Sequence, residues 1–461
     1  MSSKPVDRPR PPSVEAVLKR LRGSDAADGA DPDALTISVR EIVDTERASL
    51  ADGRPARTPD DLAAEALDRL ASFTDAGLPA AINATGVIVH TNLGRAPWPE
   101  AIARAVAELA GGPVLLELDR STGRRGARAR IAEDHLVALT GAQDALVTNN
   151  NAAALVLAVG LAGRGGVVVS RGELVEIGGG VRIPDIVRRA GAKLIEVGTT
   201  NRTRAADFEA VLAEGRARAV LRVHPSNFAM SGFTEAPEPA AVAELAHRHG
   251  AFVIDDLGSG ALLPTERYGL AHEPMPRERL AAGSDLVTFS GDKLVGGPQA
   301  GLVVGRADLI ARMRRDPLAR AVRPDKVALA GIALTLGLYR AGRATTDIPV
   351  WRMIATPVDD LRRRADAIAA ALGVGDGDRD DVEVVEHRST VGGGSLPSET
   401  LPSVGLALRS RSVSRTLARL RDGTPAVIGR VQDERVVLDL RTVPPEADAS
   451  LIVAIGIASE R

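Results

Sequence analysis

The stretch Phe289–Gly301, FSGDKLVGGPQAG, contains the side chain best suited to covalent chemistry, Lys293. The chain has 58 lysine and arginine residues, and only five of these are lysines. An amine can lose its proton and attack a carbonyl group, whereas a guanidinium cannot. A lysine kept between Ser-Gly-Asp and Gly-Gly-Pro therefore predicts a Schiff base with the aldehyde of pyridoxal phosphate (PLP).

The residues around Lys293 fit this prediction. Leu286–Ser290 is an apolar run that predicts a short buried strand, and the Ser290 hydroxyl at its end can bind a phosphate. Gly296 and Gly297 allow a flat ring to lie close to the backbone. The alternative is a surface turn with an exposed lysine, and this stretch alone leaves that alternative open.

Three consecutive asparagines, Asn149–Asn151, separate a predicted strand from the helix that follows it. Free amide groups at a helix N-terminus attract anions, so this position suits the phosphate of the cofactor. The alternative is an ordinary helix cap, for which one asparagine is enough.

Two adjacent carboxylates are candidates for the ring of the cofactor. Asp255 ends the predicted strand Ala251–Asp255, and a carboxylate there can pair with a protonated pyridine nitrogen. Spacing leaves open whether Asp255 or Asp256 does so. The pair could also bind a metal ion, although no third ligand is evident. His224 ends another strand and either lines the site or caps a turn.

A group of arginines forms a candidate oxyanion site. Arg320 and Arg323 lie three residues apart in the segment Asp316–Lys326, so we expect them to share a helix face. Together with Arg95 they could bind an oxyanion through paired hydrogen bonds. A solvated charged face is the alternative.

The elements that must position these residues alternate along the chain from Ile82 onward. Seven strands are predicted, at Ala145–Thr148, Val167–Ser170, Leu194–Val197, Ala219–Val223, Ala251–Asp255, Leu286–Ser290 and Leu302–Val304. Apolar strands that alternate with helices predict an α/β fold with a mainly parallel seven-stranded sheet covered on both faces. The site of such a sheet lies at the carboxyl ends of the strands, where these candidates fall.

The remaining segments predict two smaller parts. Residues 1–75 read as an N-terminal helical module, residues 76–340 as the large α/β domain, and residues 341–461 as a small C-terminal α/β domain. The glycine-rich loop Gly392–Pro397 lies in the small domain and can face a neighbouring element or a substrate.

Composition narrows the class of protein further. The net charge of −2 over 461 residues gives no global field for nucleic acid, and the chain has no cysteine, so thiolate chemistry and disulfides are excluded. No apolar run reaches the ~18 residues of a membrane span. We therefore expect a soluble cytoplasmic protein.

Eight long sequence motifs together resemble those of one known protein family. In chain order they are INATGVIVHTNLGRAP, TNNNAA, SRGELVEIGGGVRIPDIV, GTTNRT, HPSNF, DDLGSGAL, FSGDKLVGGPQAG and GGGSLPSETLPS. From about Ile82 to Ser403 the chain resembles the bacterial L-seryl-tRNA(Sec) selenium transferases, which are fold-type I PLP-dependent enzymes.

The resemblance implies a reaction and a set of site residues. L-seryl-tRNA(Sec) is converted to L-selenocysteinyl-tRNA(Sec) with selenophosphate, through a PLP-bound dehydroalanyl intermediate. Lys293 carries PLP, with Asp292 beside it as a second catalytic residue. The implied cofactor ligands are Asp255 at the pyridine nitrogen, Asn150, Asn151 and Ser290 at the phosphate, and His224; the implied selenophosphate ligands are Arg95, Arg320 and Arg323.

The resemblance also implies partners. The N-terminal module grips the tRNA, and the subunits form a homo-oligomer, a ring of ten built from dimers with active sites at the dimer interfaces. Two alternatives stay open: a PLP-dependent lyase acting on a small amino acid or amino-sugar acid, and a non-catalytic tRNA-binding protein of the same fold.

Overall fold

A computed structural model describes the chain in two compact units, Met1–Ala80 and Ala81–Arg461. The described residues are 10–22, 27, 30–73, 77–176, 180–228, 230, 232–374 and 381–459. The predicted boundary at residue 75 lies outside them, and the predicted division at residue 340 stays a prediction. No helix in these ranges is both long enough and apolar enough to span a bilayer.

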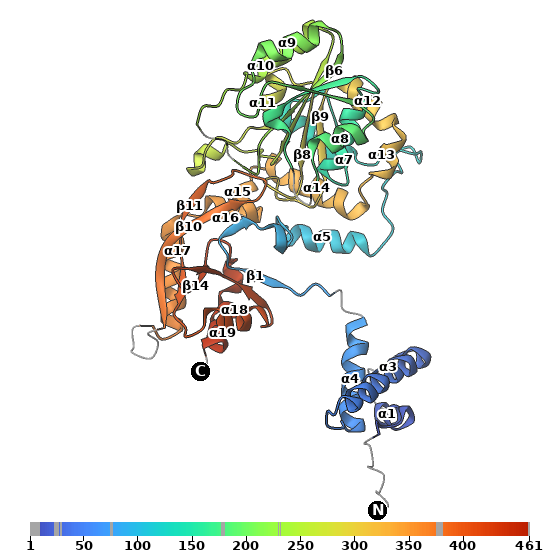
Figure 1. Ribbon diagram of the computed structural model, residues 1–461, viewed down its shortest axis with the longest axis vertical. Coiled ribbons are helices and arrows are strands. Elements are labelled where there is room, and N and C mark those ends of the chain that lie inside the picture. Colours follow the sequence, from blue (N-terminus) through green and yellow to red (C-terminus); the bar gives the residue numbers. More distant parts are fainter. Residues whose placement is uncertain are drawn as a thin grey trace, which may run out of the picture. The chain divides into compact units, whose positions relative to one another are not determined.

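The N-terminal unit is built from helices α1 (Val14–Leu21), α3 (Pro32–Ala51) and α4 (Pro59–Phe73), shown in blue in Figure 1. The Ser13 side chain caps α1 and the Asp31 side chain caps α3, as oxygen side chains do at helix starts. Between the helices, buried Glu46 accepts a 2.7 Å hydrogen bond from Arg57 Nε. The predicted helical module is therefore present.

The second unit contains a seven-stranded sheet. Its strand order is β3 (Asp144–Thr148), β9 (Gly301–Gly305), β8 (Leu286–Ser290), β7 (Phe252–Gly258), β6 (Ala217–Val223), β4 (Gly166–Ser170) and β5 (Lys193–Val197). β9 runs antiparallel to its two neighbours, β3 and β8, and the other adjacent strands of this sheet pair in parallel. The prediction of a mainly parallel sheet is confirmed.

Helices cover both faces of this sheet (Figure 1). One face packs against α7 (Asn151–Gly160), α8 (Ile183–Arg189) and α12 (Ala307–Arg315). The other face packs against α9 (Ala205–Ala213), α10 (Pro239–Arg248), α6 (Arg130–Thr140) and α14 (Lys326–Arg340), with α11 (Pro276–Ala281) beside β8. Successive strand residues point to opposite faces, so Val167 and Val169 join one core and Val168 joins the other.

A second sheet combines strands from the two ends of this unit. Its order is β13 (Arg430–Gln432), β14 (Arg435–Asp439), β11 (Thr400–Leu408), β10 (Val382–Gly392) and β2 (Val87–Val89). Separately, β1 (Ala81–Asn83) pairs with β12 (Ala426–Ile428). The segment that begins at Ile82 therefore joins strands from the C-terminal part of the chain.

Shorter elements complete the unit. The remaining helices are α5 (Glu100–Ala110), α13 (Pro317–Ala321), α15 (Ala344–Asp347), α16 (Pro349–Ala355), α17 (Val358–Ala371), α18 (Val413–Arg421) and α19 (Asp448–Ser459). The 3₁₀ turns are η1 (Thr91–Leu93), η2 (Arg171–Glu173), η3 (Thr265–Tyr268) and η4 (Pro445–Ala447).

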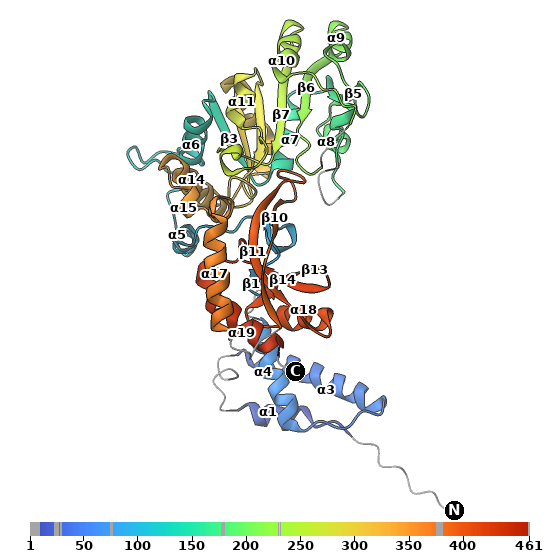
Figure 2. The ribbon, with the colours of Figure 1, turned by 90° about the vertical axis from the view of Figure 1, so that its left-hand side faces the viewer.

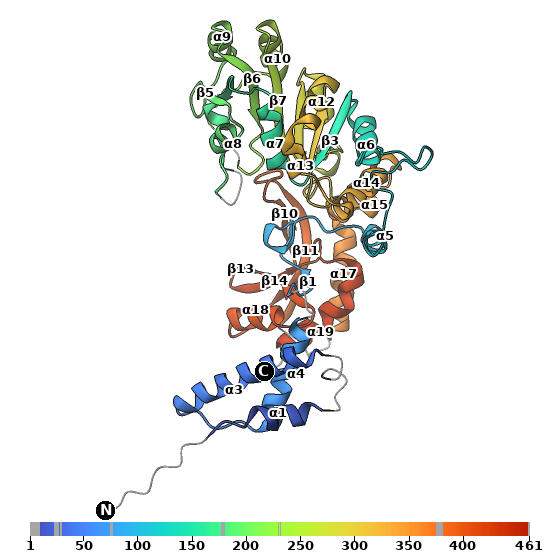
Figure 3. The ribbon, with the colours of Figure 1, turned by 90° about the vertical axis from the view of Figure 1, so that its right-hand side faces the viewer.

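The β10–β11 hairpin reaches the large sheet. Figures 2 and 3 both show its tip against the edge of that sheet. The tip contains Gly394, and a Cβ built on this glycine would lie 2.7 Å from Lys293 Nζ. The glycine-rich loop predicted to face a neighbour therefore forms one wall around Lys293.

Candidate active site

Lys293 lies in the turn after β8, and its side chain is only 7% exposed. Leu294 N, next to it, donates a 3.0 Å hydrogen bond to Ser259 O. The carbonyl of Leu294 accepts hydrogen bonds from Tyr339 Oη at 2.9 Å and Trp351 Nε1 at 2.8 Å. Buried donors thus hold the turn in place, and the reading of an exposed surface lysine is wrong.

The surroundings of the Lys293 amine prepare it to react. Burial lowers the pKa of Lys293 because the charged ammonium is poorly solvated there. The strongest opposing influence on this pKa is the carboxylate of Asp256, while Arg95 lowers the pKa further. An amine with a lowered pKa loses its proton more easily and becomes a better nucleophile.

Asp256 is the carboxylate that shares this environment. It is 3% exposed, and its Oδ1 accepts 2.8 Å hydrogen bonds from Asn151 Nδ2 and Thr288 Oγ1. Burial raises the pKa of Asp256, and the two hydrogen bonds and Lys293 lower it. A buried carboxylate held by neutral donors can accept a further proton or pair with a cation.

Asp255 does not share the environment of Asp256. It also does not end its strand, which corrects that expectation. β7 continues to Gly258, so Asp255 and Asp256 are successive interior residues and point to opposite faces. Asp255 Oδ2 lies 3.7 Å from Arg279 Nε, and Ser284 Oγ donates to it at 3.4 Å. Carboxylates on opposite faces cannot chelate one metal ion, so the metal alternative for the pair is wrong.

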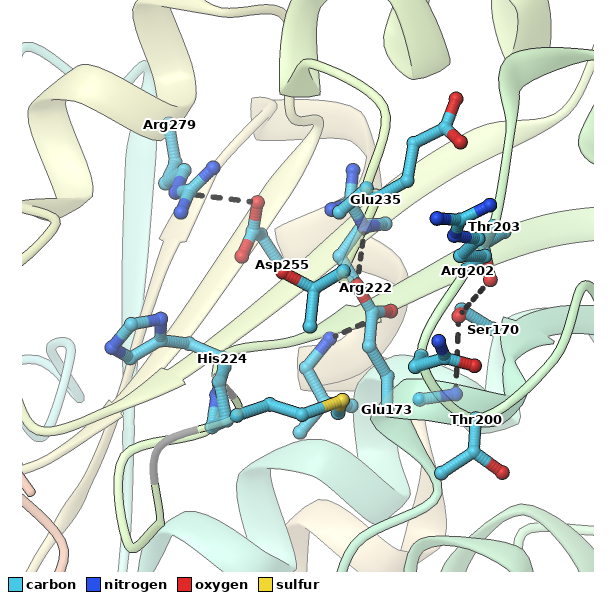
Figure 4. Close-up of a pocket in the computed structure, with 17 residues that line it drawn as sticks. Ser170, Glu173, Thr200, Arg202, Thr203, Arg222, His224, Glu235, Asp255 and Arg279 are labelled. Carbon is cyan, nitrogen blue, oxygen red and sulfur yellow. Dashed lines mark hydrogen bonds and ion pairs between the residues drawn. The ribbon is translucent and has the colours of Figure 1, made fainter. Parts of the chain in front are cut away.

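The surroundings of Asp255 form a cavity of about 270 Å³, shown in Figure 4. Arg222 Nε donates a 2.8 Å hydrogen bond to Glu173 Oε1 in its wall, and Figure 4 shows Asp255 turned toward Arg279. Neither Lys293 nor Asp256 lines this cavity. Arg222 was missed in the sequence, although a charged residue inside the apolar run VLRV was a signal for a buried polar contact.

The asparagine segment contains a helix cap, which the alternative reading expected, and its role at a phosphate stays a prediction. Asn150 Oδ1 accepts a 2.9 Å hydrogen bond from Ala153 N, so its side chain caps α7. Asn151 is the first residue of α7 and bonds Asp256, as described above. The buried Oδ1 atoms of Asn149 and Asn151 have no hydrogen-bond partner in the described part of the chain.

Ser290 ends β8 at the same edge of the sheet. It pairs with Gly301 of β9, which in turn pairs with Thr148, the residue before the asparagines. Ser290 and the start of α7 therefore lie at the same end of the sheet, separated by β9, and their joint role at a phosphate stays a prediction.

His224 follows β6, and its backbone N donates a 2.9 Å hydrogen bond to Asp256 O. Its Nε2 lies 3.3 Å from Oε1 of Glu273, a carboxylate that is 2% exposed. His224 therefore lines the cavity of Figure 4, while its backbone is bonded to that of Asp256. Glu273 was not predicted, because nothing in its sequence neighbourhood distinguishes it from a surface residue.

Arg95 contacts the residue next to the lysine. Its Nη1 lies 2.8 Å from Asp292 Oδ2, and Ala96 N donates to Asp292 O at 3.2 Å. Arg95 has a φ of 63°, which non-glycine residues rarely adopt. Such strain persists only where surrounding contacts enforce it, which is frequent at functional sites.

Arg320 and Arg323 do not share a helix face, which corrects that expectation. α13 ends at Ala321, because Pro324 disfavours helical geometry at the residue before it. Arg323 Nη1 lies 3.6 Å from Glu117 Oε1. Among the described contacts, none joins Arg95, Arg320 and Arg323 to one another.

These residues fit PLP. Lys293 provides a buried amine for the aldehyde, Asp256 a buried carboxylate for the ring nitrogen, and the start of α7 free amides for the phosphate. In the described ranges no three His, Asp or Glu side chains gather as metal ligands do.

Comparison with known proteins gives the family. A family model described as L-seryl-tRNA selenium transferase matches residues 81–444. The chain is 41% identical over 452 residues to the L-seryl-tRNA(Sec) selenium transferase of Rhizobium meliloti (strain 1021), with 97% of each chain covered. The chain belongs to the L-seryl-tRNA selenium transferase family. The resemblance predicted from the motifs is thereby confirmed.

Other matches agree with this family. The enzyme of the same name from Methylocella silvestris is 43% identical over 444 residues, covering 95% of this chain and 94% of that one. A solved structure of D-glucosaminate-6-phosphate ammonia-lyase matches with a TM-score of 0.58 at 21% identity, over 83% of this chain and 96% of that chain. The latter match shows the fold, which is that of fold-type I PLP enzymes.

The family match covers the site described above. The span 81–444 that matches the selenium transferase family includes Lys293, Asp256 and Arg95. It also includes Gly394 of the hairpin that closes over the lysine.

Proposed function

We propose that this protein converts L-seryl-tRNA(Sec) into L-selenocysteinyl-tRNA(Sec), with PLP as cofactor and selenophosphate as selenium donor. The observation that carries the proposal is the buried Lys293 amine between Asp256 and Gly394, in a chain of the selenium transferase family.

The residues of the chain have separate tasks in this reaction. Bound PLP supplies an electron sink that acidifies the Cα–H of the seryl group. Lys293 holds the cofactor and, once its amine is free, removes the Cα proton, which its lowered pKa allows. Asp256 would pair with the pyridine nitrogen, and Asn150, Asn151 and Ser290 would hold the phosphate at the start of α7.

The arginines bind the selenium donor. Arg95 is held beside Lys293 by Asp292, which orients its guanidinium toward an incoming oxyanion. Arg320 and Arg323 follow on α13 and just beyond it. Three guanidinium groups suit the phosphate oxygens of selenophosphate, since they neutralise charge as the donor reacts.

The proposal extends to the partners and the assembly. The N-terminal helical unit grips the tRNA, which explains a module that a small free substrate does not require. The subunits form a ring of ten made of dimers, with active sites at the dimer interfaces. The protein acts in the cytoplasm, where aminoacylated tRNA is made.

The test is the visible absorbance of the protein after reconstitution with PLP, beside the variant Lys293→Ala. We expect a cofactor band in the wild-type spectrum that Lys293→Ala loses. Seryl-tRNA(Sec) should change the band, and free serine should leave it unchanged. A band that responds only to small amino acids favours the lyase. Absence of any band after reconstitution contradicts the cofactor and the function together.

A further inference from the structure

Glu273 is a buried residue, and one of its carboxylate oxygens has no hydrogen-bond donor among the described residues. The residue is 2% exposed, and the oxygen is Oε1. The imidazole of His224 lies beside it: its Nε2 is 3.3 Å from Oε1 and is itself buried with no hydrogen-bond partner in the described part of the chain. Burying a carboxylate or an imidazole nitrogen without a hydrogen-bond partner costs free energy of folding. A buried pair of this kind is therefore a candidate for a functional role.

The backbone around Glu273 is fixed by its neighbours. Glu273 N donates a 3.0 Å hydrogen bond to Oγ1 of Thr265, which is fully buried. The same hydroxyl donates to Ala271 O at 2.6 Å, and Met275 N donates to Glu278 Oε2 at 2.9 Å. These hydrogen bonds fix the segment between η3 and α11, so the Glu273 carboxylate is held in one position.

Glu273 belongs to the environment of Lys293 although it lies far from it in sequence. Its negative charge is among the influences that raise the pKa of Lys293. His224 is tied to the same site, because its backbone N bonds the carbonyl of Asp256. The contact between His224 and Glu273 thus connects the loop before α11 to the ends of β6 and β7.

We propose that Glu273 is a positioning residue that accepts the Nε2 proton of His224 and fixes the imidazole beside Lys293 and the bound cofactor. Whether the imidazole is neutral or charged, a proton on Nε2 is then held by the carboxylate, and the ring cannot turn. Free rotation would misplace the imidazole, and small misplacements in a site reduce rates strongly. The inference rests on the proposed function, since it assigns His224 to that cofactor site.

The experiment compares Glu273→Ala, Glu273→Gln, His224→Ala and the double alanine variant in the full-length protein. The readouts are the dissociation constant of PLP, from absorbance titration of the apoprotein, and kcat and KM for seryl-tRNA(Sec). We expect Glu273→Ala to weaken PLP binding roughly tenfold, because it leaves the buried Nε2 of His224 without its acceptor. Glutamine keeps the acceptor oxygen, so Glu273→Gln should stay within about threefold of wild type.

The double variant separates positioning from a general loss of structure. If Glu273 acts through His224, the double alanine variant is no worse than the weaker-binding single variant. Additive losses overturn the inference. Equal losses in Glu273→Gln and Glu273→Ala also overturn it, because they assign Glu273 a charge effect on Lys293 instead.

A matched control is the exposed pair of His272 and Glu266 in the same segment, with Nδ1 and Oε1 2.7 Å apart. Glu266→Gln should leave PLP binding unchanged. If Glu273→Ala does not fold, His224→Ala and Glu273→Gln still decide between the outcomes. Failure of wild type to bind PLP contradicts the proposed function, whereas wild-type binding without coupling between Glu273 and His224 contradicts only this inference.

Discussion

Asp255 and Asp256 are adjacent on β7, yet they serve two different regions of the molecule. Asp256 faces α7 and Lys293, where its partners are the neutral donors Asn151 and Thr288. Asp255 faces the cavity of Figure 4, where Arg279 and Arg222 surround it. Burial raises the pKa of both carboxylates, so burial alone does not identify the functional one.

The partners make the difference between the two sides. On the Asp255 side the positive charges of the guanidinium groups already offset the negative charges of the carboxylates. A protonated pyridine ring placed there would therefore find no carboxylate that lacks a cationic partner. On the Asp256 side the hydrogen-bond donors are neutral, and the cationic neighbour is Lys293, the residue proposed to react. A buried carboxylate left free to pair with a cofactor is therefore a better guide to the site than the presence of a cavity.

The largest effect should separate the two carboxylates directly. Under the proposed function Asp256→Asn removes the charge that would keep the pyridine nitrogen protonated, so we expect kcat for selenocysteinyl-tRNA formation to fall by about 100-fold. Asp255→Asn should change kcat less than about threefold. If single-turnover assays show equal losses of rate for Asp255→Asn and Asp256→Asn, the two carboxylates do not have different roles.

A substitution of Gly394 tests whether the tip of the β10–β11 hairpin forms part of the site around Lys293. Its φ is +83°, and an added Cβ would lie 2.7 Å from Lys293 Nζ, so Gly394→Ala should displace the amine and lower kcat by about tenfold or more. The matched control is Gly393→Ala, whose Cβ would meet only the Thr91 hydroxyl at 3.2 Å. Similar rates for the two variants would place the hairpin tip away from the chemistry.

Substitutions of Asn151 and of its neighbour Asn150 should have smaller effects. Asn151→Ala removes one of two hydrogen bonds to Asp256, worth about 1 kcal/mol, so PLP should bind about fivefold more weakly. Asn150→Ala should also weaken PLP binding, and because it removes a helix cap it should in addition lower the free energy of unfolding by about 1 kcal/mol. Titration with PLP and urea denaturation measure the two effects, and a loss of stability in Asn151→Ala but not in Asn150→Ala would contradict the assignment.

Arg279 should give the smallest effect on catalysis. Arg279→Gln leaves Asp255 with one cationic neighbour fewer in a buried setting, so the free energy of unfolding should fall by about 2 kcal/mol. The value of kcat should change less than twofold, because Arg279 lies on the cavity side. Urea denaturation and steady-state kinetics check both expectations, and a large loss of kcat at wild-type stability would assign the cavity to the reaction.

The sequence predicts what depends on local patterns. Apolar runs located the seven strands, and the scarcity of lysine singled out Lys293. The strand predicted to end at Asp255 continues three residues further to Gly258. Adjacent strand residues point to opposite faces, and the sequence pattern did not reveal which of the two carboxylates faces α7.

Contacts between distant segments could not be predicted. Glu273 meets His224 only after folding, and its own loop has no helical or strand period to interpret. Arg323 was placed on a helix by its spacing from Arg320, but Pro324 was the stronger local signal. Likewise, no pattern in the segment from Ile82 predicts that β1 and β2 pair with β12 and β10.

The most direct test is a crystal structure of the protein with PLP bound at Lys293. The account predicts that the pyridine nitrogen lies within hydrogen-bonding distance of an Asp256 carboxylate oxygen, with the phosphate at the start of α7. A pyridine nitrogen bonded to Asp255, or a cofactor seated in the cavity of Figure 4, would contradict it.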